Sequence, residues 1–275
     1  GAGTPRSAGQ PEAPAARGEP LAEGQSYEAS APSRSPRLAV WAEASGARRM
    51  ASAEDARPYH ELAQEAACGG SLPAWVETTI ANDVPRTLFV GRPPPSTEDE
   101  ATLTRLLRAL AWWDPQLAYC QGMNFVARFA LLSSHEAALG AEAGTGQAGS
   151  GQEANEGARD GPGAGAESEA ESFWLVACLL WRYGARGLFL ERTPLLKLYS
   201  FCLSRLLERR LPEVHSSLGG LDAVLGFKWF GTLFTTVLPG EVAARAWDLL
   251  FRDGLTALLC LALGLCSLLG PLLLA

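Results

Sequence analysis

Residues 98–113 read EDEATLTRLLRALAWW, and their apolar side chains recur at the spacing of an α-helix. Ser96 and Thr97, just before this stretch, are residue types that cap the first turn of a helix. Because positions three and four apart share one helix face, the stretch carries an apolar stripe that must pack against other elements. The stripe consists of Leu103, Leu106, Leu107, Leu110 and Trp113.

The same helical spacing recurs from residue 37 onward, and no sustained apolar–polar alternation indicates a β-strand. Thr193-Pro194 has the pattern of a helix cap followed by proline at the first helical position, and Gly254 is a stop signal. The sequence therefore predicts an all-α domain of roughly ten short helices. Besides 98–113, helices are expected over 37–47, 55–67, 121–132, from 173, and over 193–210, 222–236 and 239–252.

Two segments lack the large apolar residues that a folded core needs. Residues 1–35 are rich in Ala, Pro, Gly and Ser, and residues 140–171 are rich in Gly, Ala and Glu, with seven acids and one arginine. Such segments cannot bury enough surface to offset their ordering entropy, so both are expected to be disordered. The folded domain is expected over 36–275, with its C-terminal helices truncated.

The charge distribution and the cysteines exclude several function classes. The net charge of −7 arises mostly from residues 140–171, and the rest of the chain has no run of Lys or Arg. A nucleic-acid-binding protein or an electrostatic membrane anchor needs such a basic footprint. The six cysteines form no Cys-x-x-Cys pair and the three histidines are scattered, which predicts reduced cytosolic thiols and no metal site.

The tail over residues 255–275 contains no charged residue, a length compatible with a membrane span. Hydropathy alone is equally compatible with a helix buried on all sides. Pro271 near the end, the absence of flanking positive charge and the short connection to the preceding helix favour the buried helix.

Two short motifs carry the chemistry of the chain. Residues 80–87 read IANDVPRT and residues 119–125 read YCQGMNF, so the first offers Arg86 and the second offers Gln121. Hydrolysis of a nucleoside triphosphate needs a cation for the charge on the phosphoryl oxygens and an amide to orient the attacking water. The chain has no Gly-x-x-x-x-Gly-Lys-Ser/Thr loop to bind a nucleotide itself. The motifs therefore indicate a helper that acts on the nucleotide of another protein.

These motifs resemble the Ile-x-x-Asp-x-x-Arg and Tyr-x-Gln signatures of the TBC domain, a family of GTPase-activating proteins for Rab GTPases. Other similar pieces occur in the family's order over about residues 36–270: Arg37-x-x-x-Trp41, Phe173-Trp174, Lys228-Trp229-Phe230 and Ala246-Trp247-Asp248. The resemblance implies an all-helical domain that binds a GTP-bound Rab and supplies two residues in trans. It also implies a cytoplasmic regulator of vesicle trafficking, recruited to membranes through the Rab and not itself an enzyme. It needs no cofactor of its own, because GTP and Mg²⁺ are bound to the partner.

By motif position, the resemblance implies that Arg86 is an arginine finger and Gln121 a glutamine finger. It implies that Asp83 holds the arginine loop, whereas Arg37 and Trp41 belong to the scaffold. Simpler interpretations exist for each residue. Arg86 could close an ordinary surface ion pair with Asp83, and Asp83 could be a helix N-cap with Arg86 in the first turn.

The residues around Gln121 are expected to support it. Tyr119 is expected to be a rigid aromatic flank, and Asn124 to hydrogen-bond the local turn rather than act as a finger. Gly122 is expected to let a partner's backbone approach closely. Cys120 has no nearby histidine to activate it, so an inert thiol is expected. The eight tryptophans are assigned to packing or interfaces.

Three functions compete. The leading hypothesis is a Rab GTPase-activating protein, because both Arg86 and Gln121 are present. A non-catalytic Rab-binding module or scaffold is the alternative, and the loss of either side chain would have favoured it. A tail-anchored membrane protein depends only on residues 255–275.

Overall fold

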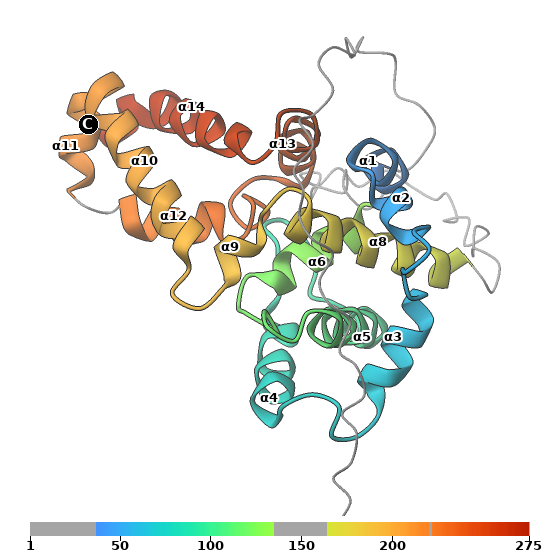
Figure 1. Ribbon diagram of the computed structural model, residues 1–275. Coiled ribbons are helices and arrows are strands. Elements are labelled where there is room, and N and C mark those ends of the chain that lie inside the picture. Colours follow the sequence, from blue (N-terminus) through green and yellow to red (C-terminus); the bar gives the residue numbers. More distant parts are fainter. Residues whose placement is uncertain (1–36, 135–163, 220–221, 275) are drawn as a thin grey trace, which may run out of the picture. The chain divides into compact units, whose positions relative to one another are not determined.

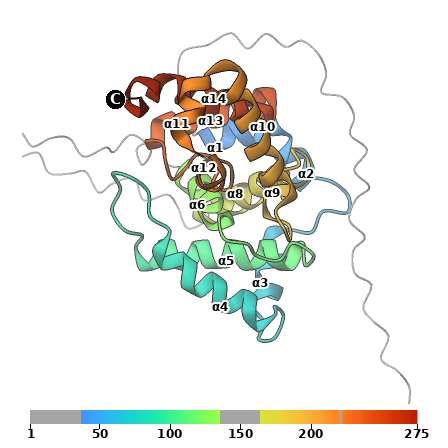
Figure 2. The same cartoon turned by 90° about the vertical axis from the view of Figure 1, so that its left-hand side faces the viewer.

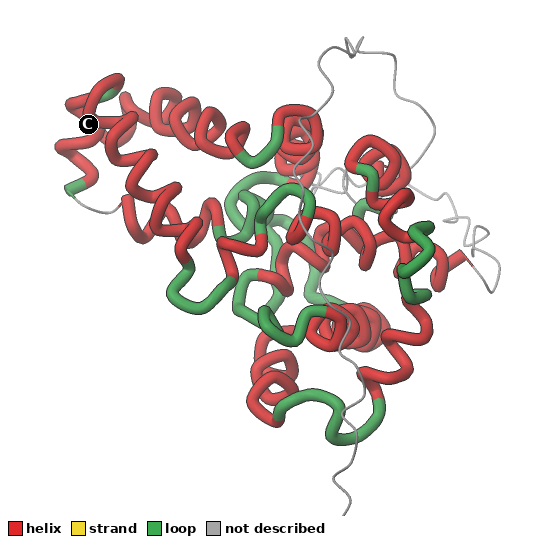
Figure 3. Tube along the Cα trace, viewed as in Figure 1, coloured by secondary structure: helices red, strands yellow, loops and turns green. Residues whose placement is uncertain are grey.

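The computed structural model describes residues 37–134, 164–219 and 222–274, all of which belong to one compact unit over 33–275 (Figure 1). Every regular element in these ranges is a helix, and Figure 3 shows no strand among them. The predicted all-α class is confirmed. The segment 1–35 and residues 140–163, both expected to be disordered, lie outside the described residues.

The described helices follow one another in chain order. The first half holds α1 (Arg37–Ser45), α2 (Ala47–Ala51), α3 (Tyr59–Ala67), α4 (Ala74–Asp83), a 3₁₀ turn η1 (Val84–Arg86), α5 (Thr97–Trp113) and α6 (Met123–Leu132). The second half holds α8 (Ala164–Trp181), α9 (Arg186–Phe189), α10 (Pro194–Arg210), α11 (Pro212–Leu218), α12 (Asp222–Phe230), α13 (Gly240–Asp253) and α14 (Thr256–Leu273).

Helix α5 begins where its capping signal predicts. The Ser96 side chain accepts a hydrogen bond from the Asp99 backbone N–H at 3.1 Å, and the Asp99 carboxylate accepts one from the Ser96 N–H at 2.8 Å. This reciprocal capping box satisfies two backbone donors that a helix start leaves free. Both α3 and α4 pack on α5, and Figure 2 shows them lying beside it.

Several predicted boundaries are wrong for local backbone reasons. The helix expected over 37–47 is divided at Gly46, whose φ of 85° is outside the helical range. The helix expected over 222–236 ends at Phe230, because Leu233 and Phe234 have φ of 48° and 64° in a tight turn. Thr193 precedes α10 as predicted, but its left-handed backbone makes no side-chain cap.

Helix α8 corrects the predicted limit of the disordered insertion. The insertion was expected to reach residue 171, whereas residues 164–171 form the first two turns of α8. Glu169 is buried there and accepts hydrogen bonds from the Tyr59 hydroxyl and the Arg105 guanidinium. Glu171 pairs with Arg48 at 2.6 Å. Two of the acids that indicated a solvated segment, Glu169 and Glu171, are ion-pair partners of other helices.

Aromatic rings in the core join helices that are distant in the chain. The indole of Trp41 on α1 lies 5.3 Å, centroid to centroid, from Trp247 on α13, and Phe129 on α6 lies 4.8 Å from Trp247. Helix α8 is buried on all sides over Ser172–Leu180 and packs against α1, α2, α3, α5 and α6. This packing fixes α5 and α6, the two helices that border the motifs.

Helix α14 is buried on one face only, so the expectation of a helix buried all round is half correct. Leu258, Ala262 and Cys266 are fully buried against neighbouring helices, whereas Leu268 and Leu272 are exposed. Its packing partners are α10, α11 and α13. Across the described ranges, no helix reaches the length and hydropathy needed to cross a membrane.

Candidate functional site

Arg86 lies at the end of a continuous helical segment. Helix α4 is anchored on α5 by Glu77, which pairs with Arg108 at 2.7 Å, and it continues directly into η1. The Arg86 side chain is 71% exposed, and its Nε donates to the carbonyl of Asn82 at 2.8 Å. The guanidinium is therefore accessible while part of it is held against the last turn of α4.

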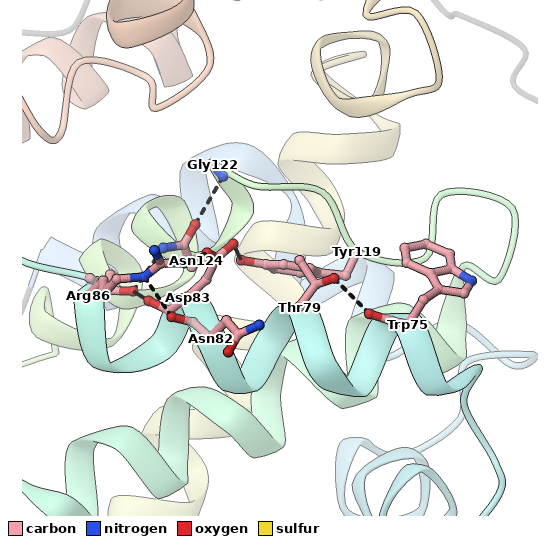
Figure 4. Close-up of polar contacts among 9 residues, drawn as sticks. Trp75, Thr79, Asn82, Asp83, Arg86, Tyr119, Gly122 and Asn124 are labelled. Carbon is pink, nitrogen blue, oxygen red and sulfur yellow. Dashed lines mark hydrogen bonds and ion pairs between the residues drawn. The ribbon is translucent and has the colours of Figure 1, made fainter.

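Asp83 joins the two motifs. Its carboxylate is 7% exposed and accepts a hydrogen bond from Arg86 at 3.0 Å and one from the Tyr119 hydroxyl at 2.9 Å (Figure 4). The N-cap alternative for Asp83 is wrong, because the residue ends α4 and its side chain caps no helix. The charge of this buried carboxylate is balanced by the guanidinium and stabilised by the phenol.

A second hydrogen-bonded bridge joins the motifs on the other side of Arg86. The buried Thr87 hydroxyl donates to the Asp83 carbonyl at 2.8 Å and accepts from the Asn124 amide at 2.8 Å. The side-chain amide oxygen of Asn124 in turn accepts a hydrogen bond from the Gly122 backbone N–H at 3.0 Å. Asn124 thus contacts both motifs and closes the turn before α6.

The two bridges enclose both candidate side chains. Arg86 lies between Asp83 and Thr87, and Gln121 lies between Tyr119 and Asn124, so each belongs to a segment held at both ends. Gln121 is exposed and makes no hydrogen bond within the described ranges. The arrangement presents a guanidinium and a free carboxamide on two linked segments, which are the groups that phosphoryl transfer uses.

Gly122 is required by this chain's own backbone rather than by a partner. Its φ is 109°, and a Cβ built on it would lie 2.5 Å from the carbonyl oxygen of Gly231. The segment that carries Gln121 is therefore pressed against the turn after α12. The expectation that Gly122 admits a foreign backbone is replaced by this internal contact.

Two residues of the site were not predicted. Thr87 is the last residue of the first motif, and Arg128 lies on α6. The buried Arg128 guanidinium donates to the Thr87 carbonyl and lies 5.6 Å from the Phe89 ring centroid. A lone arginine within the apolar run 123–132 was the available signal, because a charge on a buried helix face needs a partner.

The titratable groups beside Gln121 remain protonated at neutral pH. Burial, followed by the nearby Asp83 carboxylate, raises the pKa of the Tyr119 phenol well above its usual value. The same two causes raise the pKa of the Cys120 thiol. Tyr119 is therefore a hydrogen-bond donor to Asp83, and Cys120 is a poor nucleophile.

Arg37 and Trp41 lie on α1, and their contacts are with α13. Arg37 pairs with Glu241 at 2.9 Å, and the buried Trp41 indole donates to Asp248 at 2.7 Å. The structure brings Asp83, Arg86, Tyr119 and Asn124 together by hydrogen bonds, whereas these two residues bind one helix to another. No group of three His, Cys, Asp or Glu side chains in the described ranges could hold a metal ion.

The family model described as RabGAP-TBC, the Rab-GTPase-TBC domain, matches residues 35–274. The chain belongs to this family. The match covers all the described helices, and hence the elements that position Arg86 and Gln121. The TBC fold also accounts for the all-helical architecture.

Relatives of this TBC domain include named GTPase activators. The chain is 30% identical over 193 residues to the "GTPase-activating protein GYP5" of Saccharomyces cerevisiae, covering 69% of this chain and 17% of that protein. It is 29% identical over 226 residues to the human "Growth hormone-regulated TBC protein 1", covering 79% of this chain and 55% of the relative. The chain therefore spans about half or less of the length of these relatives.

Solved structures share the fold of this TBC domain. The Chlamydomonas flagellar RabGAP TBC domain superposes with a TM-score of 0.63 at 21% identity, covering 86% of this chain and 67% of that one. The Ypt/Rab-GAP domain of Gyp1p superposes with a TM-score of 0.68 at 15% identity, covering 86% and 76%. At these identities the likeness concerns the fold.

Proposed function

We propose that this TBC domain accelerates GTP hydrolysis by a GTP-bound Rab-family GTPase. Arg86 neutralises charge on the transferred phosphoryl group, and Gln121 orients the attacking water. GTP and Mg²⁺ belong to the partner, and the domain supplies only side chains. It acts in the cytoplasm and reaches membranes through the Rab.

The observation that carries the proposal is the pair of bridges, Asp83 with Tyr119 and Thr87 with Asn124. They link two segments 35 residues apart in sequence, while Arg86 and Gln121 themselves remain exposed. Preorganised donors are more effective than flexible ones, because no further ordering is needed when the transition state forms. A relative whose name is "GTPase-activating protein GYP5" also supports the proposal.

The Arg86 guanidinium is held by contacts within the chain, and its side chain can also reach a position that is accessible to a partner. Its Nε and one terminal nitrogen contact the Asn82 carbonyl and the Asp83 carboxylate. The Arg86 side chain is 71% exposed, and the Asp83 carboxylate keeps the hydrogen bond from the Tyr119 hydroxyl when the guanidinium turns toward phosphoryl oxygens. Asp83 is buried and also hydrogen-bonded by Tyr119, so it keeps the backbone that carries Arg86 in place while the guanidinium moves.

The test is single-turnover GTP hydrolysis by a panel of GTP-loaded Rab GTPases. Arg86→Ala is expected to lower the stimulated rate by about 10³-fold or more, and Gln121→Ala to remove most of the stimulation. Arg252→Ala is a matched control, because Arg252 is another exposed arginine paired with a neighbouring aspartate. Gln64→Ala, an exposed glutamine on α3, is the control for the amide.

Both controls should retain wild-type stimulation. Full stimulation by the Arg86→Ala protein would remove the arginine from its proposed role. Tight binding of a GTP-loaded Rab without any rate change across the panel would instead establish the alternative of a non-catalytic binding module.

A further inference from the structure

Trp75, on the first turn of α4, is the exposed member of the eight tryptophans, all of which lie in the described ranges. It is 57% exposed, whereas the other seven are buried or half-buried. Its indole N–H makes no hydrogen bond within the described part of the chain. A single exposed apolar side chain is ordinary in itself, so its position has to carry the argument.

That position is on the same helix face as Arg86. Trp75, Thr79, Asn82 and Arg86 follow one another at spacings of four, three and four residues, which repeat along one side of a helix. At 1.5 Å per residue, Trp75 lies about 16 Å along the axis from Arg86. Figure 4 shows Trp75 near the start of α4 and the arginine at its end. We name Trp75, Thr79 and Asn82 the Trp75 stripe.

This distance is comparable to the size of a protein interface. A stable interface covers about 800 Å² on each partner, equivalent to a disc of about 16 Å radius. A GTPase whose nucleotide receives Arg86 therefore extends over the neighbouring turns of α4. The stripe can be covered by a partner at little cost because it carries no charge. The two acids of α4 do not add charge to it, since Glu77 is paired with Arg108 and Asp83 is buried.

Exposed apolar side chains flank Arg86 on its other side as well. Leu88 and Val90, in the connection after η1, are both exposed. Arg86 thus lies between an uncharged helix face that carries the exposed Trp75 indole and two exposed apolar side chains that follow it in the chain. Interfaces place their tryptophan and arginine anchors in such settings, surrounded by groups that exclude water.

We propose that the Trp75 stripe is a docking surface for the same GTPase, with the Trp75 indole packed on an apolar surface beside the partner's nucleotide pocket. This inference rests on the proposed function, because it is the reach of Arg86 that fixes where the partner lies. Trp75 takes part in binding and not in the chemical step. Its loss therefore raises KM for the GTP-loaded GTPase and leaves kcat unchanged.

The experiment measures kcat and KM for a Rab GTPase that the wild-type domain stimulates. Trp75→Ala is expected to raise KM about tenfold or more with kcat within about twofold of wild type. Trp75→Phe keeps an apolar ring and is expected to recover most of the affinity. Leu268→Ala is the matched control, because Leu268 is 74% exposed on α14 and should leave both constants unchanged.

Thermal unfolding shows whether each variant keeps the wild-type stability, as expected for an exposed position. An unchanged KM for Trp75→Ala, with Arg86→Ala still inactive, overturns the docking surface and leaves the proposed function intact. A kcat loss with unchanged KM also overturns it. If light scattering shows a wild-type dimer that Trp75→Ala dissociates, with KM unchanged, the stripe binds a second copy instead. Absence of both stimulation and binding by the wild type overturns the two proposals together.

Discussion

Gly122 has a backbone conformation that other residues rarely adopt, and it also lies against a neighbouring carbonyl. Its φ is 109°, and an added Cβ would meet the Gly231 oxygen at 2.5 Å. Both effects act on the segment that holds Gln121. A change at this one position therefore affects stability and the placement of the carboxamide together.

We expect Gly122→Ala to lower the free energy of unfolding by about 2 kcal/mol or more and to reduce stimulated GTP hydrolysis. Urea denaturation measures the first effect and single-turnover hydrolysis the second. Gly70→Ala is the matched control, because Gly70 has a φ of 82° with no atom within 4 Å of the added Cβ. Equal losses in the two variants would show that the Gly231 contact has no energetic role.

Asp83 illustrates why a residue's partners matter more than its spacing. It lies three positions before Arg86, which fits an N-cap and an ion pair equally well. The hydroxyl of Tyr119, 36 residues away, occupies its second oxygen. That contact turns a local pair into the link between the two motifs.

At the level of helices, α8 depends on polar contacts at its start. Its first two turns are poor in large apolar residues, and Glu169 attaches them to α3 and α5 through Tyr59 and Arg105. The rest of α8 is held by burial over Ser172–Leu180. The start of the helix should therefore be the part most sensitive to loss of charge.

We expect Glu169→Gln to destabilise the domain by about 2 kcal/mol, because it removes a buried charge that Arg105 and Tyr59 both contact. Glu171→Gln, two residues further along the same helix, is the control. Its pair with Arg48 is more exposed, so a loss below about 1 kcal/mol is expected in urea denaturation. An equal loss in both variants would contradict the importance of the buried site.

For the molecule as a whole, three buried tyrosines and the half-buried Tyr183 predict sensitivity to alkali. Burial is the largest cause that raises the pKa of Tyr59, Tyr119, Tyr183 and Tyr199, and for Tyr183 it raises the value to about 12. A phenol whose pKa is higher in the folded state contributes stability below the unfolded pKa of about 10. That contribution is lost as the pH rises toward the folded value.

We therefore expect the free energy of unfolding to fall steeply above about pH 10, and tyrosinate absorbance to rise together with the loss of helical circular dichroism. The reference is free tyrosine, which titrates near pH 10 without cooperativity. Ionisation of all tyrosines near pH 10 with the helices intact would contradict the raised pKa values of these four phenols.

Helical class and the start of α5 could be predicted from sequence, because they depend on local signals, whereas the roles of Arg86 and Gln121 stay predictions. The period of apolar residues, the Ser96 cap and the two motifs each lie within a few turns of chain. The family match over residues 35–274 agrees with the resemblance that these motifs carry. Such signals need no knowledge of distant partners.

Contacts between segments far apart in the chain could not be predicted, because they depend on packing. Glu169 and Glu171 were expected to be solvated, whereas in the folded domain they contact Tyr59, Arg105 and Arg48. The Asp83–Tyr119 bond and the Gly122–Gly231 approach likewise exist only once α5, α6 and the turn after α12 are assembled. The sequence determined which side chains are present in the two motifs. The packing of the helices determined which of these side chains are buried by distant partners and which are exposed.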